Sequence, residues 1–283
     1  MRNKWLAPRV ILIAAAVLTA VIVASCRSGM VDNSSDNPSA DKQSSVTESK
    51  VEENTGTVSA DSIPEEKRRG FVEAGNNTGF YFADGELKKG GIVGSDSDGY
   101  YYADDEGKID LLYCDAVNAN GADWNVIEGK ATKVKDESDT TLNSALKAVA
   151  KCTNSKMKRE EKLRAAFDYI KTAYLEGVPH DPPYNEMDWP IVCANDLFIN
   201  GKGDCYSYGA AFAYYAKAIG YTECYACNSG GHGWAEVDGK FYDPEWDMHH
   251  QEYNHFGVAP EDSCDVDYTR GLASGAPWMR IKV

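Results

Sequence analysis

The hydrophobic and polar positions divide the chain into stretches of different character. Residues 10–24 form an apolar run interrupted only by Thr19, and residues 27–69 are mainly Ser, Asp, Glu, Lys and Thr. Residues 71–130 are rich in aromatics, Gly and Asp, and from Asp139 onward apolar residues recur at helical spacing. We therefore expect a hydrophobic N-terminal segment (1–25), a disordered tether (26–69), a β-hairpin region (70–130) and an α+β domain (135–283).

The α+β stretch predicts several helices. One is expected around Leu142–Val149, and a second is expected to end at Gly177, before Pro179. A third is expected to begin near Cys205, because Gly203 allows a tight entry, and to stop at the natural C-cap Gly220. Its residues are small and apolar on nearly all sides, which predicts a buried helix.

A β-hairpin is predicted shortly after this helix. Asp238-Gly239 lies between two β-favouring runs, and this dipeptide is typical of a two-residue turn. The resulting register pairs Val237 with Lys240 and brings His232 and Asp243 onto one face as diagonal neighbours. Continued along the strands, it also sets His232 opposite Glu245. The spacing therefore predicts a histidine and a carboxylate within side-chain reach.

Cys205 and this pair have the residue types of a nucleophilic site. At the start of a helix the dipole favours a thiolate, and free backbone N–H groups can receive an oxyanion. Asp243 can hold the tautomer of His232 while the other ring nitrogen addresses the thiol. We therefore identify Cys205, His232 and Asp243 as candidate catalytic residues.

The motifs resemble the transglutaminase-like superfamily over about residues 158–267. The matching pattern is Gly-x-Gly-x-Cys ending at Cys205, His-x-Trp-x-Glu starting at His232, then Asp243-Pro244. The resemblance implies a papain-like core, in which the helix that carries the cysteine packs on an antiparallel sheet that carries His and Asp. Two positions depart from the pattern: Asp204 replaces an apolar residue, and Gly233 follows the histidine. An inward Asp204 side chain would disfavour the thiolate.

Other polar residues are weaker candidates. Glu245 is the alternative acid for orienting His232. Trp189 and Tyr206 can line the cleft or bind the oxyanion, although packing explains them equally well. Further histidines are expected to be exposed loop residues rather than ligands: His180, His249, His250 and His255.

An aromatic repeat marks the hairpin region. Gly79-Phe80-Tyr81-Phe82-Ala83-Asp84 recurs 20 residues later as Gly99-Tyr100-Tyr101-Tyr102-Ala103-Asp104. Each unit predicts a strand that enters a tight turn. The pattern resembles the cell-wall-binding repeats of choline-binding and glucan-binding proteins, in which aromatics form ligand cages. An ordinary aromatic core is the alternative interpretation.

The N-terminus is typical of an export signal. Basic residues precede the apolar run, and Val23-Ala24-Ser25-Cys26 resembles the lipobox of bacterial lipoproteins, which implies lipid attachment at Cys26. The alternatives are an ordinary cleaved signal and an uncleaved anchor, and the run is short for a membrane span. We expect a protein lipid-anchored to the extracellular face of the cell membrane and reaching into the cell wall.

Charge and cysteine content narrow the function further. The net charge is −15, which disfavours nucleic acid as a partner. Six of the eight cysteines have no assigned role, and the sequence does not choose among their pairings: Cys114, Cys152, Cys193, Cys224, Cys227 and Cys264. Cys224-x-x-Cys227 is half of a zinc knuckle without a second ligand pair, so we expect no metal and no cofactor.

We expect an enzyme that transfers acyl groups from peptide or protein amides, with wall peptides as one candidate substrate. Hydrolysis by a peptidase or amidase is favoured over crosslinking by a transglutaminase. Two alternatives are an inactive surface-binding or adhesion protein that uses its aromatic repeats, and a different papain-like wall hydrolase. An intact Cys-His-Asp set argues against the inactive scaffold.

Overall fold

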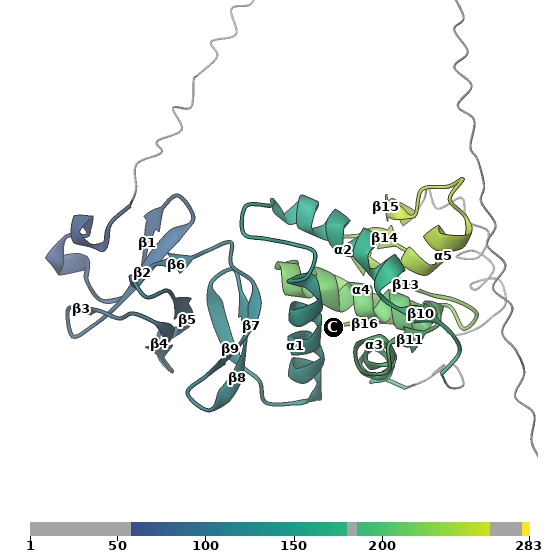
Figure 1. The fold of residues 1–283 in the computed structure, drawn as a ribbon, viewed down its shortest axis with the longest axis horizontal. Coiled ribbons are helices and arrows are strands. Elements are labelled where there is room, and N and C mark those ends of the chain that lie inside the picture. The colour runs from purple at the N-terminus through teal and green to yellow at the C-terminus, as the bar shows by residue number, and fades with distance from the viewer. Residues whose placement is uncertain (1–57, 180–185, 261–278) are drawn as a thin grey trace, which may run out of the picture. The chain divides into compact units, whose positions relative to one another are not determined.

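The computed structural model describes residues 58–179, 186–260 and 279–283. The α+β class expected from the sequence is confirmed. Two short 3-10 helices, η1 (Ala60–Ser62) and η2 (Glu65–Lys67), precede the first strand. The α-helices are α1 (Glu137–Val149), α2 (Arg159–Ala173), α3 (Trp189–Asn200), α4 (Cys205–Ile219) and α5 (Pro244–His249) (Figure 1).

The described strands form four sheets. The hairpin region has β1 (Gly70–Gly75), β2 (Thr78–Ala83), β3 (Glu86–Leu87) and β6 (Ile109–Asp110) in one sheet. Its second sheet has the order β4 (Gly91–Ser95), β5 (Gly99–Ala103), β9 (Lys130–Lys133), β8 (Ala122–Ile127) and β7 (Asp115–Ala119). The third sheet has the order β15 (Phe256–Val258), β14 (Lys240–Tyr242), β13 (Gly233–Val237), β12 (Cys224–Asn228) and β16 (Met279–Lys282). The fourth is a parallel pair, β10 (Leu175–Glu176) and β11 (Lys202–Gly203).

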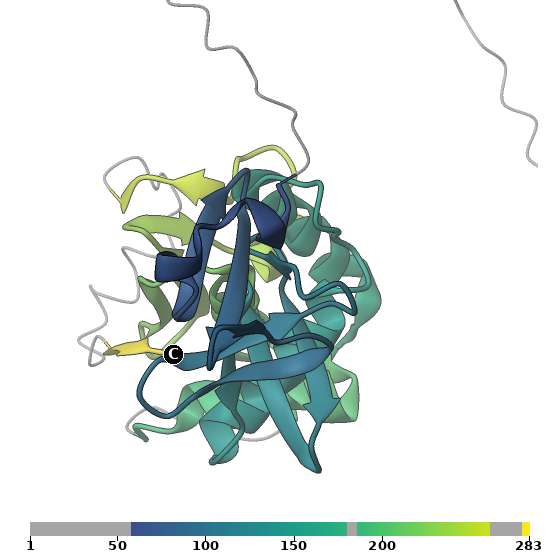
Figure 2. The same cartoon turned by 90° about the vertical axis from the view of Figure 1, so that its left-hand side faces the viewer.

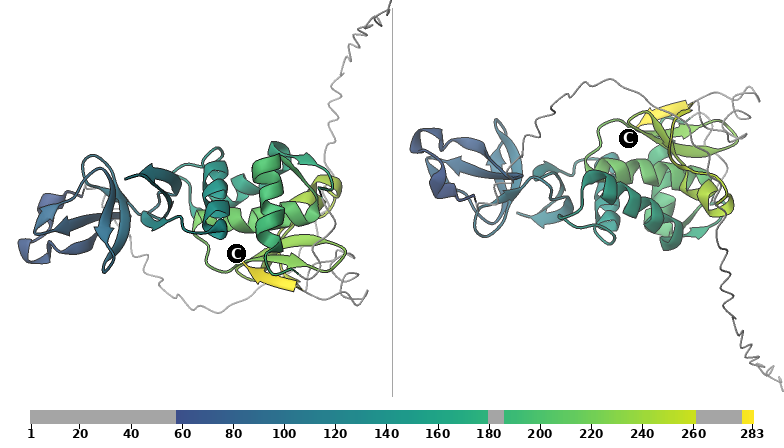
Figure 3. Two further views of the ribbon diagram at one scale, coloured as in Figure 1. Left: turned by 90° about the horizontal axis from the view of Figure 1, so that it is seen from below. Right: turned by 90° about the horizontal axis from the view of Figure 1, so that it is seen from above.

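Helix α4 is the centre of the largest core. It contacts α1, α2, α3 and α5 and also the strands β12 and β13 (Figures 1 and 3). Nearly all of its residues are buried, as the sequence predicted. The Asp204 side chain caps its N-terminus, and Gly220, at φ 108°, closes its C-terminus.

The sheet around β13 has two different faces. Cys224, Ala226, Ala235, Val237 and Tyr242 belong to the core shared with the helices. The alternate residues Cys227, Trp234 and Phe241 form a separate apolar cluster. Because successive side chains of a strand point to opposite faces, the helices cover one face and Trp234 belongs to the other.

The hairpin region, drawn in blue to teal, faces the viewer in Figure 2. Two-residue turns join its strands. Asn76-Asn77 joins β1 to β2, and Asp84-Gly85 joins β2 to β3; all four residues have positive φ. The strand and the Asp84-Gly85 turn predicted for the first repeat are therefore present. Its aromatics Phe80, Tyr81 and Phe82 are only 3–4% exposed, so they form core rather than an open surface.

A third hairpin unit follows the two aromatic repeats. Asn120-Gly121 and Glu128-Gly129 make positive-φ turns on either side of β8, as Asn76-Asn77 and Asp84-Gly85 do for β2. The sequence analysis missed this unit because β8 reads Ala-Asp-Trp-Asn-Val-Ile instead of consecutive aromatics. The hairpin geometry is thus retained where the aromatic motif is lost.

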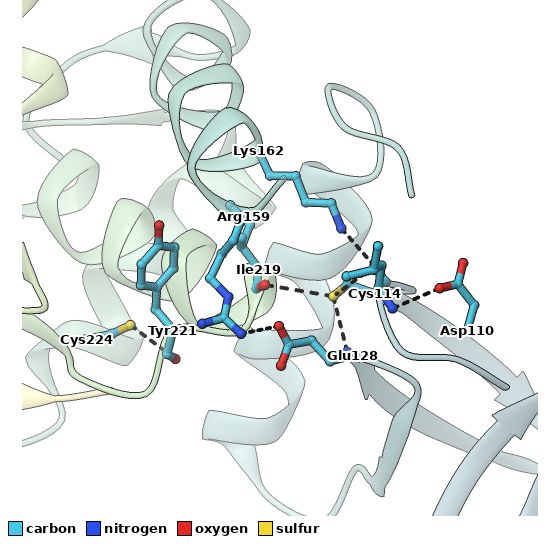
Figure 4. Close-up of polar contacts among 9 residues, drawn as sticks. Asp110, Cys114, Glu128, Arg159, Lys162, Ile219, Tyr221 and Cys224 are labelled. Carbon is cyan, nitrogen blue, oxygen red and sulfur yellow. Dashed lines mark hydrogen bonds and ion pairs between the residues drawn. The ribbon is translucent and has the colours of Figure 1, made fainter. Parts of the chain in front are cut away.

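The hairpin region contacts the helices through a polar cluster around Cys114 (Figure 4). The backbone N–H of Glu128 donates to the Cys114 sulfur at 3.3 Å, and that sulfur lies 4.0 Å from the Ile219 carbonyl oxygen. The Lys162 ammonium donates to the Leu112 carbonyl at 2.8 Å, and Arg159 pairs with Glu128. These contacts join the third hairpin unit to α2 and to the end of α4.

Several expectations concern residues outside the described part of the chain. The signal segment, Cys26, most of the tether, His180 and Cys264 belong to this group. None of the helices in the described part has the length and apolar character that a membrane span requires. One helix boundary was predicted wrongly: α2 ends at Ala173 rather than Gly177, because Leu175 and Glu176 pair with the strand before Cys205.

Candidate active site

Cys205 is the first residue of α4 and is partly exposed. The Asp204 carboxylate accepts hydrogen bonds from the Ser207 backbone N–H at 3.2 Å and from the Ser207 hydroxyl at 3.3 Å. The residue that departs from the family pattern therefore serves as the helix cap, which explains an acid at this position. Its recorded hydrogen bonds are directed along the helix, to Ser207.

The hairpin register predicted for His232 and Asp243 is present near the turn. Val237 pairs with Lys240, and Ala235 pairs with Tyr242. The ladder stops there, and Asp243 caps helix α5 instead of continuing β14: its Oδ1 accepts from the Trp246 backbone N–H at 3.0 Å. His232 immediately precedes β13.

His232 lies between the other two candidate residues. Its Nε2 is hydrogen-bonded to Asp243 Oδ2, and Cys205 lies close enough to affect the pKa of the ring. With Nε2 facing the carboxylate, Nδ1 is the nitrogen left for the thiol. Burial alone lowers the pKa of His232, but Asp243 and Cys205 together raise this pKa well above its ordinary value. The three residues named from the sequence therefore meet in space.

Two glycines allow α4 to approach β13 closely enough for this contact. A Cβ at Gly209 would lie 2.7 Å from the Trp234 backbone, and a Cβ at Gly233 would lie 2.7 Å from the Tyr206 Cα. Because Gly233 follows His232 and Tyr206 follows Cys205, these backbone contacts set the imidazole beside the thiol. The sequence analysis noted Gly233 only as a departure from the pattern and did not recognise Gly209.

Helix α5 covers the histidine. The Trp246 ring packs at 5.1 Å from the His232 ring, and the His250 ring stacks on Trp246 at 4.3 Å. Glu245, the alternative acid, is partly buried on the same helix. Burial and the nearby Asp243 raise the pKa of Glu245, against the opposing effect of His232. The recorded hydrogen bond to the imidazole comes from Asp243, so Asp243 is the better-placed orienting acid.

Trp189 and Tyr206 are both buried beside the start of α4. Their rings meet edge to face at 6.1 Å. The Trp189 indole nitrogen is fully buried and has no hydrogen-bond acceptor among the described residues. A buried indole N–H without an acceptor is costly, which makes it a donor available to a bound group.

The remaining histidines divide into two groups. His249 is exposed and its Nε2 donates to the Glu176 carboxylate, and His250 is partly exposed. His255 is only 3% exposed, so its expected place in an exposed loop was wrong. The backbone explains its burial, because the His255 carbonyl accepts from the Asp243 N–H at 3.0 Å and fixes β15 against the candidate site.

The described cysteines are all free thiols. Burial raises the pKa of Cys224 to about 12 and raises those of Cys114, Cys152, Cys193 and Cys227 as well. Cys224 and Cys227 belong to apolar clusters on opposite faces of the sheet, so they do not form one metal-binding pair. Cys205 differs from these thiols by its position beside His232.

Comparisons of the chain with protein-family models, with curated proteins and with solved structures gave no match. A thiol, an imidazole and a buried carboxylate in this order can generate a nucleophile and move its proton.

Proposed function

We propose that this protein is a cysteine acyl-transfer enzyme that acts on peptide or protein amides. The observation that carries the proposal is the position of His232, whose Nε2 is hydrogen-bonded to the buried Asp243 carboxylate and whose ring lies close enough to Cys205 for the thiol to affect its pKa. A structural cysteine needs neither partner. Cys205 is the nucleophile, His232 the acid and base, and Asp243 the orienting group.

The reaction is proposed to proceed in two halves. The Cys205 proton passes to His232 as the sulfur attacks the amide carbonyl carbon, and the imidazolium then protonates the departing amine, which leaves a thioester. In the second half His232 takes a proton from water, the hydroxide attacks the thioester, and the acid product leaves as the thiol is restored. If an amine replaces water, the product is a new amide. We favour hydrolysis, as the sequence analysis did.

The oxyanion that forms in both halves needs hydrogen-bond donors. The N–H groups in the first turn of α4 are suited to this role, because helix N-termini have donors without intrahelical partners. The buried Trp189 indole N–H is a second candidate donor. Both belong to the elements around Cys205, which supports their assignment to the same site.

The finer fold assignment is also a proposal. A helix with an N-terminal cysteine packed on an antiparallel sheet next to the histidine agrees with a papain-like core of the transglutaminase-like kind. A lipid anchor at Cys26, attachment to the extracellular face of the cell membrane and a wall peptide as substrate remain proposals from the N-terminal sequence.

The first test is selective alkylation. The full-length protein, purified in detergent without reductant, is treated with iodoacetamide near pH 6, and the modified cysteines are mapped by mass spectrometry. We expect Cys205 to react first, because burial keeps the other described thiols protonated. Replacing His232 with alanine should slow this reaction by roughly 10-fold or more.

Matched variants complete this test. His255→Ala changes another buried histidine, whose Nε2 is hydrogen-bonded to the His250 carbonyl oxygen at 3.1 Å, and should leave the Cys205 rate within about 2-fold. Equal rates in the wild type and in His232→Ala would contradict the enzyme proposal. That result would move attention to binding by the hairpin region.

A further inference from the structure

A second cluster of ligating side chains lies next to the candidate site. Glu176 from β10 and Glu245 and His249 from α5 each offer one ligand atom, and these atoms lie within 4.8 Å of one another. His249 Nε2 is 2.5 Å from Glu176 Oε1 and 3.7 Å from Glu245 Oε1. We propose that these three residues bind a divalent transition-metal ion, with Zn²⁺ as the best match.

The donor set supports this choice of metal. Zinc takes imidazole nitrogen and carboxylate oxygen at about 2.0–2.2 Å, so neighbouring ligands of a tetrahedral site are about 3.3 Å apart. The observed separations of 2.5 and 3.7 Å lie on either side of that value, and small side-chain rotations bring them to it. Glu245 and His249 are four residues apart on one helix, a spacing that directs both side chains to the same face.

Exposure and charge also suit an ion from solution. The side chains of Glu176 and His249 are each 47% exposed, whereas that of Glu245 is 18% exposed, so the cluster has an open side and an inner side. Asp247 adds another carboxylate on the same helix. Lys171 pairs with both Asp247 and Asp168, so one positive charge is shared by two negative charges. An acidic surface of this kind attracts cations.

The proposed ion would join the two halves of the candidate site. Strand β10 pairs with β11, which ends at Gly203, two residues before Cys205. Helix α5 begins directly after Asp243, which caps it. An ion held by Glu176 and by Glu245 and His249 would tie the cysteine side to the His–Asp side. No metal was expected from the sequence, because Cys224-x-x-Cys227 has no second ligand pair. This cluster was missed, because Glu176 is far along the chain from Glu245 and His249.

Glu245 also belongs to an inner group. Its carboxylate, His232 and Asp243 form a second set of ligand atoms within 4.8 Å of one another. An ion in this inner group would occupy the imidazole that the enzyme proposal needs. The outer group (Glu176, Glu245 and His249) and the inner group share Glu245, but the outer group contains His249 and the inner group contains His232. Replacing each histidine in turn therefore shows which group binds the ion.

The test measures metal binding and does not require activity. Full-length protein in detergent is stripped with EDTA and titrated with Co²⁺, followed by visible absorption, and with Zn²⁺, followed by thermal unfolding. We expect one equivalent of Co²⁺ with bands typical of N and O ligands and no thiolate charge transfer. Zn²⁺ at about 100 times its Kd should raise the unfolding temperature by roughly 5–10 °C.

Three variants identify the ligands. His249→Ala and Glu176→Gln should each weaken Co²⁺ binding at least about 10-fold, as loss of a direct ligand requires. His250→Ala is the matched control, because His250 adjoins His249 but pairs with Glu252, and it should bind as the wild type does. Circular dichroism and unfolding without metal confirm that each variant is folded.

Three outcomes would overturn the proposal. The first is the absence of binding at millimolar metal, and the second is unchanged binding in both His249→Ala and Glu176→Gln. The third is loss of binding in His232→Ala with retention in His249→Ala, which would assign the ion to the inner group. The first two results do not bear on Cys205 alkylation, and alkylation of the EDTA-stripped protein tests the enzyme proposal separately from the third. Failure of the metal proposal is therefore distinct from failure of the enzyme proposal.

Discussion

The hairpin region and the α+β region use aspartates in opposite ways. In the hairpin region, Asp98 is exposed and accepts a hydrogen bond from the Tyr81 hydroxyl at 2.8 Å, which with two serines lowers the pKa of Asp98. In the α+β region, Asp243 is 1% exposed and is paired with an equally buried imidazole. An exposed carboxylate changes its neighbour little, because water screens it. A buried one controls the protonation of its partner.

The same residue type therefore has a structural role in the hairpin region and a role in the protonation of His232 in the α+β region. In the hairpin region, the exposed carboxylates Asp96 and Asp98 accept hydrogen bonds from the hydroxyls of Tyr100 and Tyr81. Burying a charged pair costs free energy that a simple core would not require. A buried His–Asp pair next to a free thiol is therefore the stronger indication of function.

Removal of the Asp243 charge should give the largest effect. Asp243→Asn keeps an N-cap for α5 but supplies no negative charge to His232. We expect acyl transfer from a nitrophenyl ester to fall by about 10³–10⁴-fold, as in other triads. Asp98→Asn is the control from the hairpin region and should leave the rate unchanged. Similar acyl-transfer rates in Asp243→Asn and Asp98→Asn would mean that the buried Asp243 has no special role in the reaction.

A methyl group at Gly209 should have the next largest effect. Gly209→Ala drives a Cβ against the Trp234 backbone, and overpacking of this kind costs about 1–3 kcal/mol. The approach of α4 to β13 should widen, and Cys205 alkylation should slow toward the His232→Ala rate. In Gly231→Ala the added Cβ meets nothing within 4 Å, so that variant should be neutral. Urea unfolding and Cys205 alkylation rates are measured for both variants, and equal values in Gly209→Ala and Gly231→Ala would contradict the prediction.

The third prediction concerns pH. Asp243 and Cys205 raise the folded-state pKa of His232 above its unfolded value. The stability from this ion pair is therefore complete below the ordinary pKa of histidine and is lost as pH rises through the raised pKa. Wild type should exceed Asp243→Asn in stability at pH 6, and the gap should close in alkaline solution. The difference in unfolding free energy between the two proteins is measured by urea unfolding in EDTA, from pH 6 into alkaline solution. A gap that does not change with pH would mean that His232 is neutral in the folded protein.

The smallest effect is expected in the hairpin core. Ile109 is fully buried among Tyr81, Val93 and Ala103, and Ile109→Val removes one methylene group at a cost of about 0.5–1.5 kcal/mol. Hydrogen exchange should accelerate in β1–β6, while Cys205 alkylation stays constant. A changed alkylation rate would show that the hairpin core and the candidate site are coupled, contrary to the comparison.

Local sequence signals predicted much of the candidate site. Asp238-Gly239 defined the register of Val237 with Lys240, and Gly220 defined the end of α4. The register also predicted that His232 and Asp243 lie close together, although the ladder ends at Tyr242 and both residues lie just beyond the paired strands. These features depend on residues close together in the chain, so turn chemistry and helix caps were sufficient.

Features that depend on distant residues were not predictable in the same way. Asp243 caps a helix instead of extending β14, because Pro244 supplies no backbone donor and suits the first helical turn. His255 is buried by its pairing near Asp243, and Glu176 reaches His249 only through the parallel pair β10–β11. Neither partner is indicated by periodicity within a single segment.

The position of β16 has a consequence for the order of folding. Strand β12 is paired on one side with β13 and on the other with β16, where Ala226 meets Ile281. During synthesis the hairpin that follows His232 leaves the ribosome well before Ile281 does. Until then β12 has an open edge, the kind of surface that recruits other chains. The sheet beside the candidate site is therefore completed late, and a nascent chain halted before residue 279 would be prone to aggregate through β12.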